Sequence, residues 1–208
     1  LYISDASGSD NVWMSDPDGR NARQITRETT SQMTGPAWGP QGTIAAVRMD
    51  ATVPHLHASE IRLYDPAGGA GRLLAKPTSG ENVHEAAFSP DGRYAYYTEK
   101  VTGPSASHVY IDGNHMNYAI MQRDMQTGQT EELIKGFGGA TTPVVSRDGK
   151  QIAFVRRVQA KTVLFTYDIK SGEQRPVYDA LSRDDQADFI GQGLYYPQYD
   201  WLPDNRHN

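Results

Sequence analysis

Residues 86–92 read Ala86-Ala87-Phe88-Ser89-Pro90-Asp91-Gly92, and they form the clearest copy of a unit that occurs four times in the chain. The other copies are Pro36-Ala37-Trp38-Gly39-Pro40-Gln41-Gly42, Pro143-Val144-Val145-Ser146-Arg147-Asp148-Gly149 and Gln198-Tyr199-Asp200-Trp201-Leu202-Pro203-Asp204-Asn205. Proline presets φ to about −65° at the start of a turn, and glycine or asparagine accepts a positive φ at its end. Each copy therefore predicts a tight turn. Three of the copies continue into β-favouring strands, at 43–47, 94–98 and 151–155.

A second unit is a short alternating segment that ends in aspartate, and it too occurs four times. Its copies are 12–16, 61–65, 120–124 and 164–168, and a glycine follows each aspartate three or four residues later (Gly19, Gly68, Gly128 and Gly172). A second short segment, expected to be a strand, follows the glycine in every copy. This unit predicts a β-hairpin.

The two units together predict a four-stranded antiparallel meander, whose strands we label A to D in chain order. The first unit joins A to B and the second joins C to D. Equivalent A-strand positions are separated by 50 residues (Trp38 to Phe88), 57 (Phe88 to Val145) and 56 (Val145 to Trp201), near the roughly 40–50 residues of a propeller blade. We expect strands within 36–47, 61–75, 86–99, 120–134, 143–157 and 163–178.

A β-sandwich is the alternative, because it also combines short strands with Gly/Pro turns. The internal register argues against it: the C-strand aspartate precedes the next A-strand position by 22, 23 and 21 residues (16 to 38, 65 to 88, 124 to 145). We therefore predict an all-β fold, a β-propeller of four-stranded antiparallel blades with three complete blades and parts of two more. It forms one domain over 1–208, with blade parts 1–30, 31–79, 80–136, 137–180 and 195–208.

Closure of the propeller has two alternatives at this stage. Strands B, C and D at the start (1–4, 11–16 and 23–26) and a lone strand A at 196–201 can complete one blade and close a ring of four. The other alternative is a larger ring, completed by sequence outside these residues or by another chain. The chain begins within a strand and has no initiator methionine, so we expect a processed or truncated piece.

The amino-acid composition excludes some classes of partner and some kinds of chemistry. The net charge is −5, with 20 Lys and Arg against 25 Asp and Glu, so no nucleic-acid partner is expected. No apolar run approaches the roughly 20 residues of a membrane span, so no membrane insertion is expected. The absence of cysteine excludes disulfides and thiol catalysis.

The run Phe88-Ser89-Pro90-Asp91-Gly92-Arg93-Tyr94 resembles the repeat core of TolB-like, WD-repeat-like propellers. The stretches 134–158 and 164–179, with Tyr199-Asp200-Trp201-Leu202-Pro203-Asp204-Asn205, are similar to propellers fused in front of secreted bacterial amidohydrolases. This resemblance is strongest over 118–205. It implies a periplasmic or secreted location, and a parent protein that is a metal-dependent hydrolase whose catalytic domain lies outside this chain. It also implies more than four blades, so the larger ring is favoured.

No catalytic residues and no cofactor are predicted within the chain itself. His55-Leu56-His57 has the His-x-His pattern of a metal site, but it follows Pro54 in a polar connection, so we predict that it holds no metal. No nucleophile elbow occurs, and the glycine-rich run 136–139 lacks the Lys-Ser/Thr of a phosphate loop.

Recognition is expected on the face that carries the long loops, 48–60, 100–117 and 179–195, and at the mouth of the central channel. The residues predicted to bind there are His84, Glu85, Thr141, Tyr195 and Tyr196. Tyr199 and Trp201 are assigned to packing between blades. The favoured function is a non-catalytic propeller that recognises or gates a peptide-like substrate for the hydrolase domain of the same parent chain. The alternative is a TolB-type periplasmic scaffold that binds a protein partner.

Overall fold

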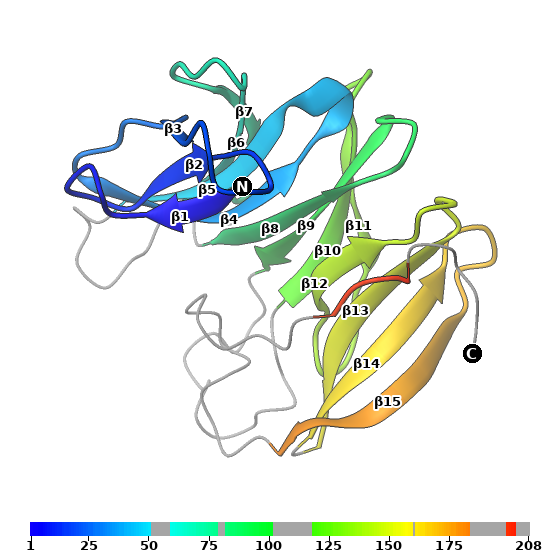
Figure 1. Ribbon diagram of the computed structural model, residues 1–208. Helices are drawn as coiled ribbons and strands as arrows, with labels where there is room; N and C mark the ends of the chain where they lie inside the picture. The colour runs from blue at the N-terminus through cyan, green and yellow to red at the C-terminus, as the bar shows by residue number, and fades with distance from the viewer. Residues whose placement is uncertain (51–58, 79–81, 102–117, 160, 184–198, 203–208) are drawn as a thin grey trace. The chain divides into compact units, whose positions relative to one another are not determined.

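The computed structural model describes residues 1–50, 59–78, 82–101, 118–159, 161–183 and 199–202. Within these residues every regular element is a β-strand, apart from the single 3₁₀ turn η1 (Pro40–Gly42) (Figure 1). The chain divides into two compact units, residues 1–86 and 87–208. Each unit is described by itself below, although strand β8 runs across the division.

In the described part of the chain the strands form four antiparallel sheets, each a meander in chain order. The first holds β1 (Tyr2–Ser4), β2 (Asn11–Met14) and β3 (Arg23–Gln24), and the second holds β4 (Ser31–Trp38), β5 (Ile44–Asp50), β6 (Ser59–Tyr64) and β7 (Arg72–Ala75). The third holds β8 (Val83–Phe88), β9 (Tyr94–Lys100), β10 (Tyr118–Asp124) and β11 (Thr130–Ile134), and the fourth holds β12 (Thr141–Val145), β13 (Gln151–Val158), β14 (Lys161–Asp168) and β15 (Gln174–Arg183). The three predicted complete blades and the partial blade at the start are confirmed in strand order. The second predicted partial blade, 195–208, lies mostly outside the described residues.

The Ser-Pro-Asp-Gly sequence forms the A-to-B turn through its own side chains. The Ser89 hydroxyl donates to Asp91 at 2.6 Å and accepts from the Tyr94 N–H at 2.9 Å. Gly92 has a φ of 70°, which glycine adopts without a Cβ clash. Ser146 repeats both bonds in the fourth sheet, with Asp148 at 2.7 Å and the Gln151 N–H at 2.9 Å. The serine, aspartate and glycine of the repeated unit therefore form the turns that the sequence predicts.

The A-to-B and C-to-D turns of one sheet lie side by side, as the meander predicts. In the third sheet the Met125 N–H donates to the Arg93 carbonyl at 2.9 Å, and the Arg93 guanidinium pairs with Asp124 at 2.6 Å. In the fourth sheet the Ile169 N–H donates to the Lys150 carbonyl at 2.9 Å. The tight turns thus share one end of each of these sheets.

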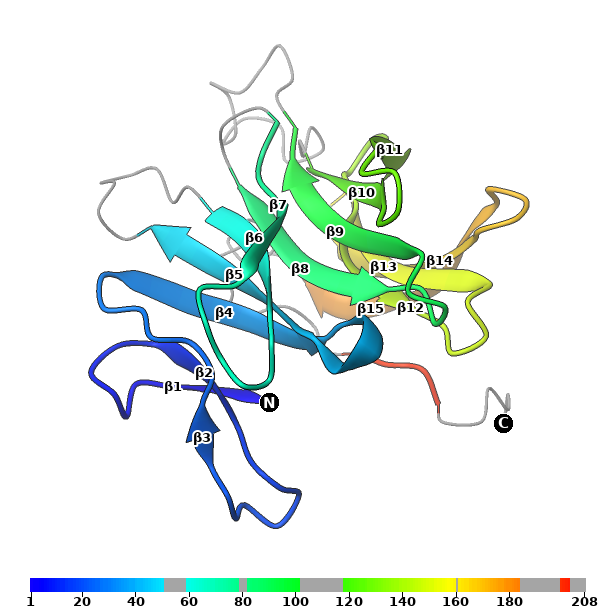
Figure 2. The same ribbon diagram turned by 90° about the horizontal axis from the view of Figure 1, so that it is seen from above.

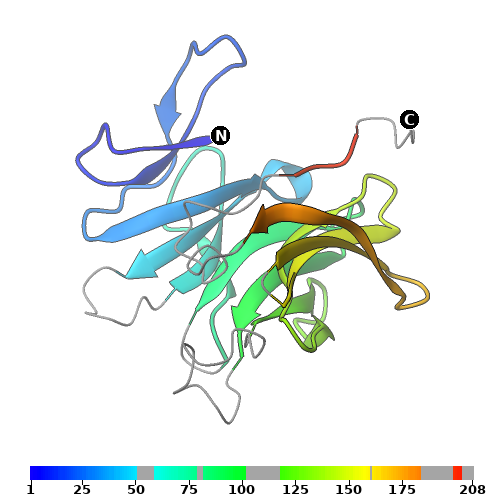
Figure 3. The same cartoon turned by 90° about the horizontal axis from the view of Figure 1, so that it is seen from below.

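Each unit has its own apolar core between sheets. The core of the first unit contains Val12, Ile25, Met33, Ile44, Ala46 and Tyr64, from the sheets β1–β3 and β4–β7 (Figure 2). The core of the second unit contains Tyr96, Ile120, Ile134, Ala140, Ile152, Phe154 and Tyr167, and the strongly twisted sheet β12–β15 is seen from below in Figure 3. Packing of consecutive sheets supplies burial that one isolated sheet lacks.

Two expected strand positions need correction. Strand β4 begins at Ser31, five residues before the expected start at Pro36, because the strand continues through a bend at Gly35. The strand expected over 196–201 is not formed in its described part, since residues 199–202 have no regular secondary structure. Side-chain bonds to β12, described below, hold these residues in place of a backbone ladder.

Candidate functional site

The A strands of the second, third and fourth sheets share an unusual backbone bend. The residue three positions before the A-strand aromatic position has a left-handed φ in every case: Gly35 at 54°, Glu85 at 34° and Thr142 at 57°. The strand register shifts at this point, between Thr34 and Ala37 and between Thr141 and Val144. Such bulges re-aim side chains and are frequent near functional sites. We call these segments (34–35, 84–85 and 141–142) the A-strand bends.

The sequence-predicted residues His84, Glu85 and Thr141 all fall on these bends. His84 and Thr141 hold the same repeat position, and Glu85 is the equivalent of Thr142. The bend at 84–85 belongs to the first unit and the bend at 141–142 to the second, so each is described within its own unit. Tyr195 and Tyr196 lie outside the described residues, as do His55 and His57 and most of the three long loops.

In the first unit the bend of β8 is anchored just before His84. The Ser59 hydroxyl, on β6, donates to the Val83 carbonyl at 2.7 Å and accepts from the Val83 N–H at 2.8 Å. Both Ser59 and Val83 are buried, and His84 is 8% exposed. One hydroxyl thus satisfies both backbone groups of the residue that precedes the bend, and fixes the start of the strand.

In the second unit the bend of β12 is built from threonines whose hydroxyls are buried. The Thr142 N–H donates to the Thr98 hydroxyl of β9 at 3.1 Å. Thr98 and Thr141 are each 1% exposed, and the neighbouring Glu99 is fully buried. Among the described residues the hydroxyls of Thr141 and Thr142 have no hydrogen-bond partner. A buried hydroxyl without a partner costs about 1–3 kcal/mol, and such groups in folded proteins need an explanation.

The segment that leads into β12 is held rigidly. The Ala140 N–H donates to the Tyr118 carbonyl at 3.0 Å, and the Arg157 N–H donates to the Gly138 carbonyl at 3.0 Å. The Arg156 guanidinium donates to the Gly139 carbonyl at 2.8 Å and lies over the ring of Phe154 at 5.2 Å. These bonds therefore fix the backbone that leads into the bend.

Residues 199–202 lie against the same strand. The Tyr199 hydroxyl donates to the Thr142 carbonyl, and the Trp201 indole N–H donates to the Val144 carbonyl at 3.0 Å. Both residues thus contact β12 through their side chains, whereas the packing between blades assigned to them from the sequence presupposed a strand that residues 199–202 do not form.

The chemistry of the β12 bend is that of hydrogen bonding. Its described groups are hydroxyls and carbonyls, with no nucleophile paired to a histidine base. No group of three or more His, Cys, Asp and Glu side chains that could hold a metal occurs in the described part of the chain. Within those residues, too, no helix is long and apolar enough to cross a bilayer. The arrangement is suited to recognising a polar ligand.

Sequence reasoning missed Thr98, Glu99 and Thr142. A glutamate at the end of the apolar strand 94–100 was the available signal, because a charged residue inside a strand buried on both faces is unusual. Nothing in the local sequence marks Thr142 as left-handed, since threonine is β-branched and avoids that region.

Comparisons with solved structures agree with the sheet architecture. The TolB-type protein from Agrobacterium tumefaciens superposes with a TM-score of 0.65 at 18% identity, covering 85% of this chain and 60% of that one. TolB from Acinetobacter baumannii gives 0.64 at 19% identity, covering 86% and 40%. Dipeptidyl peptidase 4 from Porphyromonas gingivalis gives 0.53 at 14% identity, covering 83% and 23%.

The chain thus spans less than two thirds of the length of each of these structures. No protein-family model matches the sequence, and no curated protein matches it. At these identities the likeness concerns the fold. The chain has the β-propeller fold of the TolB structures.

Proposed function

We propose that the chain is a non-catalytic β-propeller domain that recognises or gates a peptide-like substrate for a metal-dependent amidohydrolase domain lying outside these 208 residues. The observation that carries the recognition role is the pair of buried hydroxyls, Thr141 and Thr142, at the left-handed bend of β12. A hydroxyl both donates and accepts, so the pair matches the N–H and carbonyl of a peptide group. Binding such a group offsets the cost of leaving these hydroxyls unpaired.

Peptide binding at the bend is tested by removing one hydroxyl. Short unstructured peptides are titrated into the chain by calorimetry, and Thr141→Val is expected to weaken binding at least tenfold while the melting temperature is kept. Thr162→Val, at another buried threonine, serves as the control and should leave binding unchanged. Equal effects of the two substitutions on peptide affinity would show that the bend is not the binding site.

The link to an amidohydrolase rests on the sequence resemblance over 118–205, and the periplasmic or secreted location rests on the same resemblance. The coding sequence that follows residue 208 tests this link. A barrel domain with His-x-His on a strand, and later histidine and aspartate ligands, is the expected result. A different downstream domain would contradict the amidohydrolase part and leave the peptide-binding result standing.

A second function, a TolB-type periplasmic scaffold that binds a protein partner, is favoured by the likeness to TolB structures over 85–86% of this chain. A photo-crosslinking residue at Phe137, which is 65% exposed in the segment that leads into β12, separates the two in the native organism. Crosslinks to one folded protein, together with no affinity for short peptides, support the scaffold. Crosslinks to the hydrolase domain or to its substrate support the first proposal.

A further inference from the structure

A pocket in the second unit lies apart from the A-strand bends, near the tight turns of the third and fourth sheets. Its volume is about 490 Å³, within the range of roughly 300–1,000 Å³ typical of ligand sites. One side is formed by the turn that holds Pro90 and Asp91 and the other by the turn that holds Asp148 and Gly149. A Cβ added to Gly149 would lie 3.1 Å from Pro90 Cδ, so the two turns approach closely at this rim.

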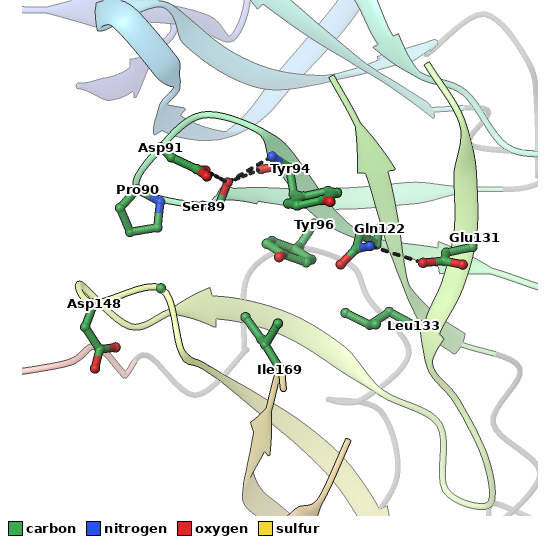
Figure 4. A pocket seen from close by; sticks show the side chains of 11 residues that line it. Ser89, Pro90, Asp91, Tyr94, Tyr96, Gln122, Glu131, Leu133, Asp148 and Ile169 are labelled. Atoms are coloured by element: carbon green, nitrogen blue, oxygen red, sulfur yellow. Dashed lines mark hydrogen bonds between the residues drawn. The ribbon is translucent and has the colours of Figure 1, made fainter. Parts of the chain in front are cut away.

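The floor and walls of the pocket combine tyrosine rings with aliphatic groups. Figure 4 shows Tyr96, Leu133 and Ile169 turned toward the same space. Tyr94 and Tyr96 are tilted against one another, with ring centroids 6.5 Å apart. Tyr94 already carries a guanidinium, because the Arg93 Cζ atom lies 5.6 Å from its ring centroid. This lining suits the apolar stem of a ligand whose end is polar.

The charges that line the pocket are all negative. Asp91, Glu131 and Asp148 are among its lining residues, and no lysine, arginine or histidine is among the described residues that line it. The hydrogen bond from the Ser89 hydroxyl lowers the pKa of Asp91, and that from Ser146 lowers the pKa of Asp148, so both stay ionised at neutral pH.

Among the described residues, the carboxylates of the pocket have few partners that would neutralise their charge. The Gln122 amide donates to Glu131 at 3.1 Å and fixes this carboxylate at the pocket wall (Figure 4). Lys150 lies 3.5 Å from Asp148, but both side chains are exposed, and an exposed pair of this kind is weak. Arg93 is bound to Asp124. The cations near the pocket therefore leave its negative character in place.

One tyrosine of the pocket wall supplies a further polar group. Tyr96 is 1% exposed and lines the pocket, and none of the hydrogen bonds observed among the described residues involves its hydroxyl. Buried tyrosine hydroxyls usually have a partner. This hydroxyl therefore offers an acceptor to a donor group that enters the pocket, and it does so independently of the carboxylates.

We infer that this pocket binds a cationic group on an apolar stem, an alkylammonium or guanidinium such as a lysine or arginine side chain of a peptide. The carboxylates attract the charge, the ring of Tyr96 holds it by cation–π contact, and Leu133 and Ile169 cover the stem. The Tyr96 hydroxyl accepts one of its N–H donors. The inference concerns this pocket alone and does not depend on the function proposed for the bends.

Calorimetric titration of the 208-residue chain tests the inference with probes that differ only in their ends. The N-acetyl N-methylamides of lysine and arginine are expected to bind at least tenfold more tightly than the norleucine derivative, which keeps the stem and lacks the charge. Their affinity should fall in about 0.5 M NaCl, because exposed charge interactions are screened. Cadaverine distinguishes the sources: equal affinity points to a free amine, and weaker affinity to a peptide side chain.

Matched variants place the binding in the pocket. Glu131→Gln is expected to weaken lysine-probe binding at least tenfold. Glu132→Gln changes the neighbouring carboxylate, which pairs with Lys135 at 2.9 Å and does not line the pocket, and it should leave affinity unchanged. Tyr96→Phe removes one hydroxyl without altering the ring, so it should weaken binding several-fold in a folded protein. Equal binding of norleucine, equal effects of the two glutamate variants, or no binding of either cationic probe up to about 10 mM overturns the inference.

Discussion

Thr142 occupies a backbone conformation that its side chain disfavours. Its φ is 57°, whereas the equivalent position in the second sheet is Gly35, with a φ of 54°. A non-glycine residue in this region costs on the order of 1–2 kcal/mol, and β-branching adds to the cost. The A strands thus keep one geometry with different side chains, which indicates that the bend is imposed by packing of the sheet.

The first prediction concerns the stability of variants at these two positions. Thr142→Gly should raise the free energy of unfolding by about 1 kcal/mol, since it relieves the strained φ and removes an unpaired hydroxyl. Gly35→Ala should lower it by about 1 kcal/mol. The added Cβ would lie 3.7 Å from Val47 Cγ2, an ordinary contact, so this cost is conformational. Urea unfolding measures both; a loss of stability in Thr142→Gly would show that its side chain supports the fold.

The second prediction concerns Gly138, where the main chain approaches β13. A Cβ at this position would lie 1.9 Å from the Arg157 carbonyl oxygen, a backbone atom that cannot move aside, and its φ is 83°. Gly138→Ala is therefore expected to cost more than about 3 kcal/mol. Gly136→Ala is the control, because its φ is 121° and nothing lies within 4 Å of the added Cβ. Similar melting temperatures of the two variants would contradict this account.

At the scale of the element, an equivalent backbone bond joins the two tight turns in both the third and the fourth sheet, and the third sheet adds an ion pair. Arg93 and Asp124 form this ion pair, and the backbone bond of the fourth sheet joins Ile169 to Lys150. The Arg93 hydrogen bond, helped by backbone N–H donors of the turn, lowers the pKa of Asp124 to about 2. A turn formed by local chemistry is thereby made sensitive to acid.

The third prediction follows from this pKa. Asp124 stabilises the fold above its unfolded pKa of about 3.9, and this contribution is lost as pH falls towards about 2. The stability difference between the wild type and Asp124→Asn should therefore shrink between these pH values. Urea unfolding at a series of pH values measures it. Arg93→Gln should flatten the same part of the profile, and an unchanged profile in this variant would rule out the ion pair as the cause.

Strand β15 has an exposed edge that can pair with another chain. It ends the order of its sheet, pairs with β14 in the described residues, and exposes Val177 and Tyr178 by 57% and 53%. A long exposed edge strand with apolar side chains is a template for pairing with another chain. Arg175 and Pro176 on the same strand limit this pairing.

At the scale of the whole molecule, the fourth prediction is weak self-association of the 208-residue chain through β15. Sedimentation velocity should show an average mass that rises with concentration. The double substitution Val177→Lys and Tyr178→Lys should suppress the rise, because edge lysines oppose edge-to-edge pairing. Leu73→Lys, on β7 and also exposed, is the control; if it suppresses association equally, the contact does not depend on β15.

The four-bladed closure considered from the sequence required the strand at Tyr199 to pair with the strand at Tyr2. In the described residues β1 pairs with β2 alone in its sheet, and residues 199–202 form no strand. Tyr199 and Trp201 instead bond to Thr142 and Val144 through their side chains. The backbone pairing that this form of closure needs is therefore not observed in the described part of the chain.

The sequence alone determined the repeat, the turns and the order of strands in each sheet. These depend on residues close together in the chain: Ser89, Pro90, Asp91 and Gly92 make their turn by themselves, and the alternation before Asp124 or Asp168 needs only the pleat of one strand. The A-strand residues His84, Glu85 and Thr141 could be selected because the repeat placed them at equivalent strand starts. Their bend could not be predicted.

Only the tertiary structure decided the A-strand bends and the cation pocket. The bond from the Thr142 N–H to the Thr98 hydroxyl joins residues 44 apart in the chain, and the pocket brings Asp91 and Asp148 together from the turns of two sheets. A left-handed threonine is locally unfavourable and is held by packing between sheets. Local propensity describes what a segment prefers, whereas these two sites depend on which distant segments meet and on the strain that their packing imposes.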